Sequence, residues 1–154
     1  MANFDGRVTL WTLAARILQV SYGSSPMAAT LDEANRVIQG ALTKARELNV
    51  KVSVAICDAG GRLVAFQRMD NSILASPFAS QGKAITAATI GRPSGDAPDN
   101  STLARVVAAA GGVFVPGKGG VPLLRDGIVE GACGVAGATW DQDEVCAAAG
   151  ADQF

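Results

Sequence analysis

The apolar positions of residues 30–49 repeat with the period of an amphipathic helix. They are Leu31, Ala34, Val37, Ile38, Ala41, Leu42 and Ala45. Steps of three and four residues place all of them on one helical face. Thr30 precedes this stripe, and Glu33 stands at the third position after it, where its side chain completes a capping box. The pattern predicts a helix that begins after Thr30 and ends near Asn49.

The next two segments have the alternating pattern of strands. Lys51–Cys57 carries Val52, Val54 and Ile56 on one face and small residues on the other. Asp58–Gly61 has the composition of a turn, and Arg62–Met69 is a returning strand. Together they predict an antiparallel hairpin. The small residues of the first strand indicate that another element packs closely against that face.

The rest of the chain predicts three further helices and three strands. The helices are residues 77–90, with Pro77 at the start, Asn100–Ala110 and Asp141–Ala149, the last with Asp141 as N-cap and Glu144 at N3. The strands are Val113–Val115 and a second hairpin formed by Val121–Arg125 and Ile128–Ala138. Gly131, Gly134 and Gly137 predict that a helix or a second subunit lies against the backbone of the last strand.

The predicted order α-β-β-α-α-β-β-β-α indicates an α+β domain with a central antiparallel sheet and flanking helices. Residues 1–26 differ from the rest and are expected to be an N-terminal extension, with a short helix at Thr9–Val20 and a linker at Ser21–Pro26. The domain proper then covers residues 27–154. Arg16 interrupts the apolar run of the extension, and the run is too short to span a bilayer. No membrane partner is therefore expected.

The absence of histidine from all 154 residues narrows the possible chemistry most. It excludes Ser-His-Asp and Cys-His catalysis and removes the commonest ligand of metals and haem. The 13 basic and 14 acidic residues give a net charge of −1 without a basic run, which argues against a nucleic-acid partner. The three cysteines form no CxxC motif, so reduced thiols and a cytoplasmic location are expected.

A glycine-rich loop is the first candidate for ligand binding. Gly112 to Lys118 nearly matches a phosphate-binding P-loop, but Gly119 replaces the required Ser or Thr and a strand follows instead of a helix. Nucleotide hydrolysis is therefore not predicted. Two interpretations stay open: a mobile glycine loop, or a loop in which Lys118 and the amides of Gly119 and Gly120 bind an anionic group.

Three charged residues outside the loop are further candidates. Lys83 lies in an alanine-rich helix, where it either reaches solvent or points into a pocket and binds a carboxylate or acts as a base. Arg68 and Asp70 close the second strand with charges of opposite sign, which form either a surface ion pair at an exposed strand end or part of a binding site. Asp143 is not explained by helix capping, unlike its neighbours Asp141 and Glu144. The spacing of these three carboxylates matches no EF-hand loop, so no metal site is predicted.

Three segments together resemble the GlcG/HbpS-like family, which also forms the C-terminal domain of PduO-type proteins. They are Val52–Asp70 (VSVAICDAGGRLVAFQRMD), Lys83–Ser94 (KAITAATIGRPS) and Gly119–Phe154, with its GGVP and GACGVAG motifs. The resemblance covers Met27 to Phe154. It implies a profilin-like sheet with flanking helices and a homo-oligomer assembled from dimers. It also implies a small-molecule ligand, since several relatives bind haem or a corrinoid.

The resemblance also implies which residues to consider. Asp58, Arg68, Lys83, Gly119, Gly120, Pro122, Gly134, Gly137 and Asp143 fall on the family pattern. Because histidine is missing, haem is expected only in a non-histidine mode. Its iron ligand is then Cys, Met, Tyr or Lys, or its propionates alone are held by Lys83, Arg68 or Arg92.

Three functions follow from these residues. The first is an oligomeric small-molecule-binding protein, with Arg68, Lys83, Lys118, Gly119 and Gly120 as the ligand-binding residues. The second is a small catabolic enzyme that transfers a proton on an organic acid or aromatic metabolite. In that case Lys83 or Asp143 is the acid or base, and Arg68 with the loop amides holds the anion. The third is a structural accessory subunit.

Overall fold

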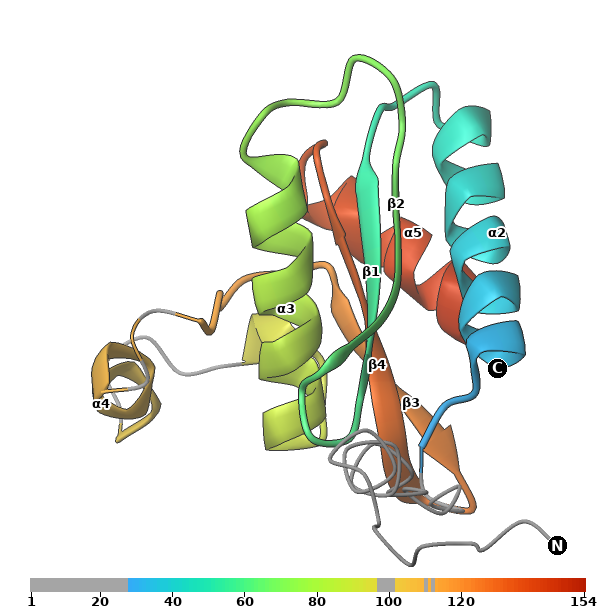
Figure 1. The fold of residues 1–154 in the computed structure, drawn as a ribbon. Coiled ribbons are helices and arrows are strands. Elements are labelled where there is room, and N and C mark those ends of the chain that lie inside the picture. The colour runs from blue at the N-terminus through green and yellow to red at the C-terminus, as the bar shows by residue number, and fades with distance from the viewer. Residues whose placement is uncertain (1–27, 97–101, 110, 112) are drawn as a thin grey trace, which may run out of the picture.

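A four-stranded antiparallel sheet with helices on both faces forms the core of this computed structural model, which describes residues 28–96, 102–109, 111 and 113–154 (Figure 1). The expected extension at residues 1–26 lies outside the described residues. In chain order the elements are α2 (Leu31–Glu47), β1 (Ser53–Asp58), β2 (Leu63–Arg68), α3 (Ser76–Ile90), the 3-10 turn η1 (Ser94–Asp96), α4 (Thr102–Ala109), β3 (Gly120–Arg125), β4 (Ile128–Ala136) and α5 (Trp140–Ala151). The predicted α+β class is confirmed.

The strand order in the sheet is β2-β1-β4-β3. Both predicted hairpins are present, β1 with β2 and β3 with β4. The two hairpins join through β1 and β4, where Ser53 lies opposite Ala136 and Asp58 opposite Gly131. This long-range pairing places β2 and β3 at the two edges of the sheet.

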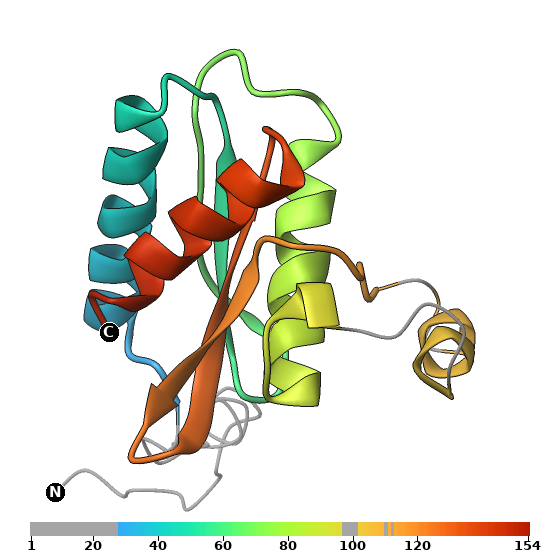
Figure 2. The same ribbon diagram turned by 180° about the vertical axis from the view of Figure 1, so that it is seen from behind.

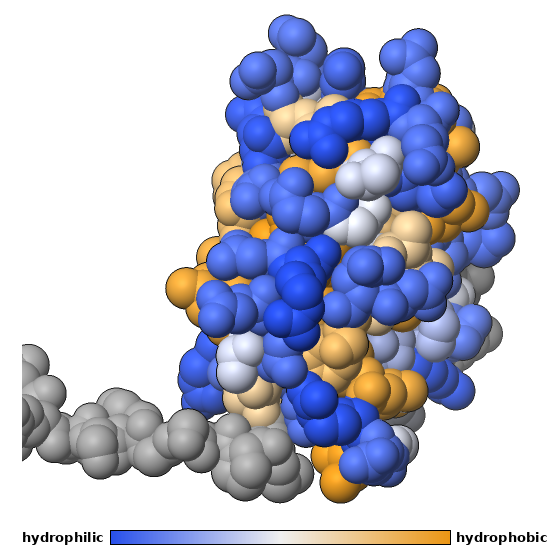
Figure 3. Space-filling view, turned by 90° about the vertical axis from the view of Figure 1, so that its right-hand side faces the viewer, coloured by the Kyte–Doolittle hydropathy of each residue, from blue (hydrophilic) through white to orange (hydrophobic). Residues whose placement is uncertain are grey.

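Helices α2 and α5 cover one face of the sheet, as Figures 1 and 2 show from opposite sides. The main core lies between them and the strands, and its fully buried members include Val37, Ile38, Val52, Val54, Ile56, Leu123, Val135 and Cys146. The predicted capping box of α2 is confirmed, because Thr30 and Glu33 bond to each other's backbone. The outer surface on the α2 side is mostly hydrophilic (Figure 3).

Helix α3 covers the other face and lies unusually close to the sheet. A Cβ atom on Gly134 would overlap the carbonyl oxygen of Ser80 and lie 2.6 Å from the nitrogen of Ala84. Only glycine permits this approach of helix to strand. The prediction that a helix or a second subunit packs on the glycines of the last predicted strand is therefore confirmed at Gly134 only. Gly131 and Gly137 instead approach the backbone of Cys57 and of Lys51–Val52.

Two sequence predictions about elements are wrong. Val113–Val115 is not a strand, so the described residues contain one strand fewer than predicted. This segment lies along α3, where the Val115 N–H donates to Thr86 Oγ1 at 2.9 Å and to the Gly82 carbonyl at 3.3 Å. The N-cap of α5 is Thr139, paired with Gln142, and not Asp141 with Glu144. Asp141 instead lies in the first turn, where its charge favours the helix dipole.

Helix α4 stands apart from the sheet and the other helices (Figures 1 and 2). It falls within the predicted helix at 100–110 and makes no extensive contact with another described element. None of the helices in the described part of the chain has the length and apolar character needed to cross a bilayer.

Candidate functional site

Lys83 and Asp143 form a buried ion pair between α3 and α5. The Nζ atom of Lys83 lies 2.8 Å from Oδ2 of Asp143 and donates to the carbonyl of Val135 at 3.1 Å. The other carboxylate oxygen of Asp143 accepts the Ala138 N–H at 3.0 Å. Lys83 is 4% exposed and Asp143 2%. The sequence left open whether the side chain of Lys83 reaches solvent or points inward. In the structure it points inward.

The glycine loop covers this pair directly. Gly119 has φ +116, and a Cβ atom at this position would lie 2.9 Å from Lys83 Nζ and 2.8 Å from Asp143 Cβ. A side chain at residue 119 would therefore meet the ion pair, and the backbone angle itself disfavours any residue but glycine. The fold thus brings Lys83, Asp143 and Gly119 into one cluster.

The loop amides that were candidates for anion binding are bonded within the chain. The Gly119 N–H donates to the Glu144 carboxylate at 2.5 Å, and the Gly120 N–H donates to Ser94 Oγ at 2.9 Å. Ser94 Oγ in turn donates to the Gly117 carbonyl. An anion at these amides would have to displace Glu144 and Ser94. Sequence reasoning did not single out Ser94, which comes from η1, 26 residues before Gly120.

Lys118 lies at the surface, outside the buried cluster. Its Nζ atom is 2.6 Å from Oδ1 of Asp141, and this hydrogen bond to a carboxylate raises the pKa of Lys118. The carboxylates at the start of α5 therefore have three different partners: Asp141 bonds Lys118, Asp143 bonds Lys83, and Glu144 bonds Gly119. Among the described residues no group of His, Cys, Asp or Glu is arranged to hold a metal ion.

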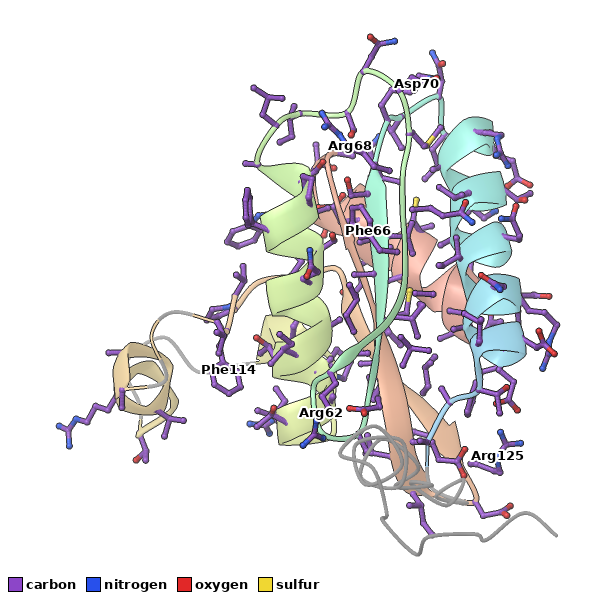
Figure 4. All side chains as sticks on the ribbon, viewed as in Figure 1. Arg62, Phe66, Arg68, Asp70, Phe114 and Arg125 are labelled. Carbon is purple, nitrogen blue, oxygen red and sulfur yellow. The ribbon has the colours of Figure 1, made fainter. Side chains whose placement is uncertain are left out.

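Arg68 is positioned by a chain of serines near the start of α3 (Figure 4). Its Nε donates to Ser72 Oγ and its Nη2 donates to the Ser72 carbonyl, both at 2.9 Å. Ser72 Oγ also accepts from Ser76 Oγ, which lies 2.8 Å from Ser53 Oγ. The salt bridges found within the described residues do not involve Arg68. Its guanidinium is thus held in place with donors still available.

An apolar groove runs along the outer side of α3. It has a volume of about 500 Å³ and carries no charged residue; its lining includes Ala75, Phe78, Ala79, Ile85, Val113 and Val115. The groove begins at Ala75, the N-cap residue of α3, three residues after the serine that holds Arg68. Phe78 is 80% exposed and Val113 48%. Hereafter we call this feature the α3 groove.

Two other hollows are less suited to an apolar ligand. A larger one between α2 and α5, of about 610 Å³, is lined mostly by polar and charged side chains such as Arg36 and Gln39. A small one of about 50 Å³ adjoins the α3 groove, shares Gln81 and Ile85 with it, and contains Cys57. Burial raises the pKa of the Cys57 thiol to about 12, so Cys57 stays protonated and is a poor iron ligand.

Sequence reasoning did not identify the α3 groove, although a signal was present. Phe78 and Ile85 are seven residues apart and so share a helical face. That face differs from the one that carries the buried Ala84, Ala87 and Ala88. A helix with apolar residues on two faces buries one of them and leaves the other for a partner or ligand. The arrangement can therefore hold an apolar molecule. Arg68 does not line this groove; it lines a separate, polar hollow of about 460 Å³ together with Arg46 and Lys51.

Comparison with known proteins gives one consistent result. Residues 29–152 match the family described as "Haem degrading protein HbpS-like". An uncharacterised 15.0 kDa protein of Citrobacter freundii is 33% identical over 81% of this chain and 91% of its own length. Protein GlcG of Escherichia coli K12 is 35% identical over 66% of this chain and 76% of its own length.

Solved structures with the same fold include two that cover most of this chain. Protein ORFY of Klebsiella pneumoniae superimposes with a TM-score of 0.77 at 27% identity, covering 86% of this chain and 94% of ORFY. A complex of PduOC with haem superimposes with a TM-score of 0.75, also at 27% identity, and covers 82% of this chain and 95% of PduOC.

Proposed function

Because this chain belongs to the HbpS-like family, we propose that it binds a flat, largely apolar small molecule that carries carboxylate groups, with haem or another tetrapyrrole as the leading class. The observation that carries this proposal is the α3 groove, an uncharged hollow of about 500 Å³ on the surface. A haem complex of the structural relative PduOC supports the choice of ligand class.

The groove suits the apolar body of such a ligand. Its walls are Phe78 and Ile85 on α3 and Val113 and Val115 on the neighbouring segment. Covering Phe78, which is 80% exposed, removes apolar surface from water at about 25 cal/mol per Å². An aromatic ring at the rim also stacks favourably on a flat conjugated ligand.

Arg68 suits the carboxylates of the ligand. The two bonds to Ser72 fix the guanidinium, so little rotamer entropy is lost when it binds an anion. A guanidinium also bonds a carboxylate with two parallel N–H donors, which a lysine does not. We therefore propose Arg68 as the anion-binding residue ahead of Lys83, Gly119 and Gly120, which are buried. Arg68 lies beside Arg46 and Lys51 in a polar hollow, outside the groove itself.

The residues do not fit haem held through a histidine, because the chain has none. Cys57 does not replace it, since its thiol is buried and protonated. We propose that a tetrapyrrole binds through its apolar face and its propionates, without a strong protein ligand to the metal. Binding should then depend little on which metal the macrocycle carries.

A titration of the full-length protein with hemin tests this proposal. We expect a saturable Soret shift near one equivalent per chain, and a similar affinity for metal-free protoporphyrin. F78S should weaken binding about tenfold, the effect of about 1.4 kcal/mol, and R68Q should weaken it by a similar factor. V145S is the matched control, because Val145 is 47% exposed on α5, away from the α3 groove.

The proposal fails if no saturable shift appears, or if V145S weakens binding as much as F78S does. Retained affinity in R68Q alone would remove the carboxylate role of Arg68. Native mass spectrometry of freshly purified protein complements the titration, because it reports both the subunit number and any small molecule that stays bound.

The second candidate is a small enzyme in which Lys83 and Asp143 transfer a proton. The supporting observation is the buried contact between ammonium and carboxylate, since a positioned lysine or aspartate can serve as a general acid or base. Substrate access would require the loop at 117–120 to open. In that case K83A abolishes turnover of an organic acid, while S94A, which loosens the loop, changes it less. Unchanged turnover in K83A would exclude the role.

We further propose that the protein assembles into a homo-oligomer in the cytoplasm. Exposed apolar residues gather around α3, among them Ile73, Leu74 and Phe78, whereas the α2 side is hydrophilic (Figure 3). Large exposed apolar surfaces usually mark interfaces. The three free, buried cysteines support a reducing compartment. Sedimentation velocity tests the assembly, and a monomer at micromolar concentration would contradict it.

A further inference from the structure

Helix α4 is an element that the rest of the described chain does not stabilise. It spans Thr102–Ala109 and makes no extensive contact with another described element. Figures 1 and 2 show it projecting on the α3 side of the sheet. A helix of eight residues is marginal on its own in water, because nucleation costs more than its few hydrogen bonds return. Packing against another surface is what usually stabilises such a helix.

The sequence of α4 is suited to an apolar partner. Leu103, Val106 and Val107 recur at steps of three and four residues, and Arg105 is the only charged residue in TLARVVAA. The side chain of Val106 is apolar, yet Val106 is 43% exposed. This composition favours burial of one helical face, as in a helix that binds in a groove.

The α3 groove has the length and chemistry to receive this helix. Eight residues of α helix are about 12 Å long, and the ten steps from Ala75 to Ile85 along α3 cover about 15 Å. The groove residues are uncharged, so Arg105 meets no like charge there. One wall, Val113 and Val115, belongs to the segment that leads from α4 back to β3.

We propose that α4 of one copy of this chain binds the α3 groove of a second copy, and that the exchange is reciprocal. Because Val113 and Val115, which line the groove, lie on the segment that follows α4, two copies related by a twofold axis can each insert α4 into the groove of the other. Such an interface is closed and self-complementary. Each copy then buries both its α4 and its groove. Both contribute to the accessible surface that a stable dimer buries, which is about 800 Å² per partner.

This inference rests on the proposed self-association and names the elements that produce it. It also changes the ligand site. The partner's α4 and the proposed ligand then use the same groove of about 500 Å³, so they occupy it in turn and not together.

Cross-linking between two variants that each carry one added cysteine tests the exchange in the full chain. A tagged A79C protein is mixed with an untagged V106C protein and treated with a short bismaleimide. We expect a covalent heterodimer in the mixture, because Ala79 lines the groove and Val106 lies on α4. The native thiols give little background, since Cys57, Cys133 and Cys146 are 2%, 0% and 0% exposed.

A control pair replaces A79C with V145C, a position on α5 that is 47% exposed and does not line the groove. Equal cross-linking in the control pair overturns the proposal, and so does the absence of a heterodimer under conditions where sedimentation shows an oligomer. Cross-linking within one chain of an A79C/V106C double variant would place α4 in its own groove and also overturn it. A monomer in sedimentation overturns the self-association itself, while the hemin titration still tests ligand binding separately.

A second measurement does not depend on cross-linking. V106D places a charge on the apolar face of α4 and should raise the dimer dissociation constant at least about tenfold. V145D is the matched control and should leave it unchanged. Equal effects of the two substitutions, or none in V106D, would contradict the exchange, provided that both variants keep the far-ultraviolet circular dichroism of the parent protein.

Discussion

The Nζ atom of Lys83 and Oδ2 of Asp143 lie 2.8 Å apart in the interior and join α3 to α5 past the end of β4. Two opposite charges that are almost fully buried depend on each other, because neither has water as an alternative partner. Lys83 also bonds Val135, and Asp143 also bonds Ala138, so the pair fastens both helices to the last strand and the segment after it.

Replacing Lys83 with methionine should lower the free energy of unfolding by about 3–5 kcal/mol, because it leaves the Asp143 carboxylate buried without its counter-charge. Urea denaturation measures this loss. The double variant K83M/D143L removes both charges and should recover much of the stability. If K83M alone is as stable as the parent, the pair has no structural role.

Replacing Gly119 with alanine should destabilise the protein more than the same change at Gly127. Both residues have positive φ, which costs alanine roughly 1–2 kcal/mol. At Gly119 the new Cβ would also lie 2.6 Å from the Val135 carbonyl oxygen, whereas nothing lies within 4 Å at Gly127. We expect G119A to lose roughly 1–3 kcal/mol more than G127A from this overpacking. Equal melting temperatures would contradict the close approach.

Glu33 should make stability depend on acid pH. Hydrogen bonds from Thr30 and Arg125 lower the pKa of Glu33 from 4.5 to about 2. A carboxyl group with a lowered pKa in the folded state contributes stability above its unfolded pKa and loses it as the pH falls. The stability difference between the parent and E33Q should therefore be largest near neutral pH and shrink between pH 4.5 and about 2. A difference that stays constant over this range would contradict the assignment.

The three cysteine thiols should be unreactive until the protein unfolds. Burial raises the pKa of Cys146 to about 11 and that of Cys57 to about 12, and raises that of Cys133 further still. A thiol reagent reacts with the thiolate, so the native protein should release almost no colour with Ellman's reagent, and denaturant should expose all three groups. One rapidly reacting thiol in the native state would indicate that the small hollow at Cys57 opens to solvent.

Local signals predicted those parts of the fold that local interactions decide. The Thr30–Glu33 capping box and the two hairpins occur as predicted, because caps and tight turns involve residues close together in the chain. Asp141 was predicted as the N-cap of α5, but Thr139, two residues earlier, takes this position. Thr139 forms a capping box with Gln142. The mistaken strand at Val113–Val115 is a short apolar run whose backbone bonds to α3 instead.

Of the candidate site, the sequence supplied the residue types but not their partners. Lys83 and Asp143 are 60 residues apart, and nothing local indicates that they meet. The loop amides looked available for an anion, yet Ser94 and Glu144 bond them from distant elements.

The sequence by itself determined the α+β class, the membership in one family and the exclusion of histidine chemistry, since periodicity, motifs and composition are properties of the chain. Only the tertiary structure decided that Lys83 is paired with Asp143 in the interior and that the apolar groove of α3 lies open at the surface. The physical reason is that burial and ion pairing depend on which segments meet across the sheet. The pairing of β1 with β4 and the contact of Gly134 with α3 determine which segments meet.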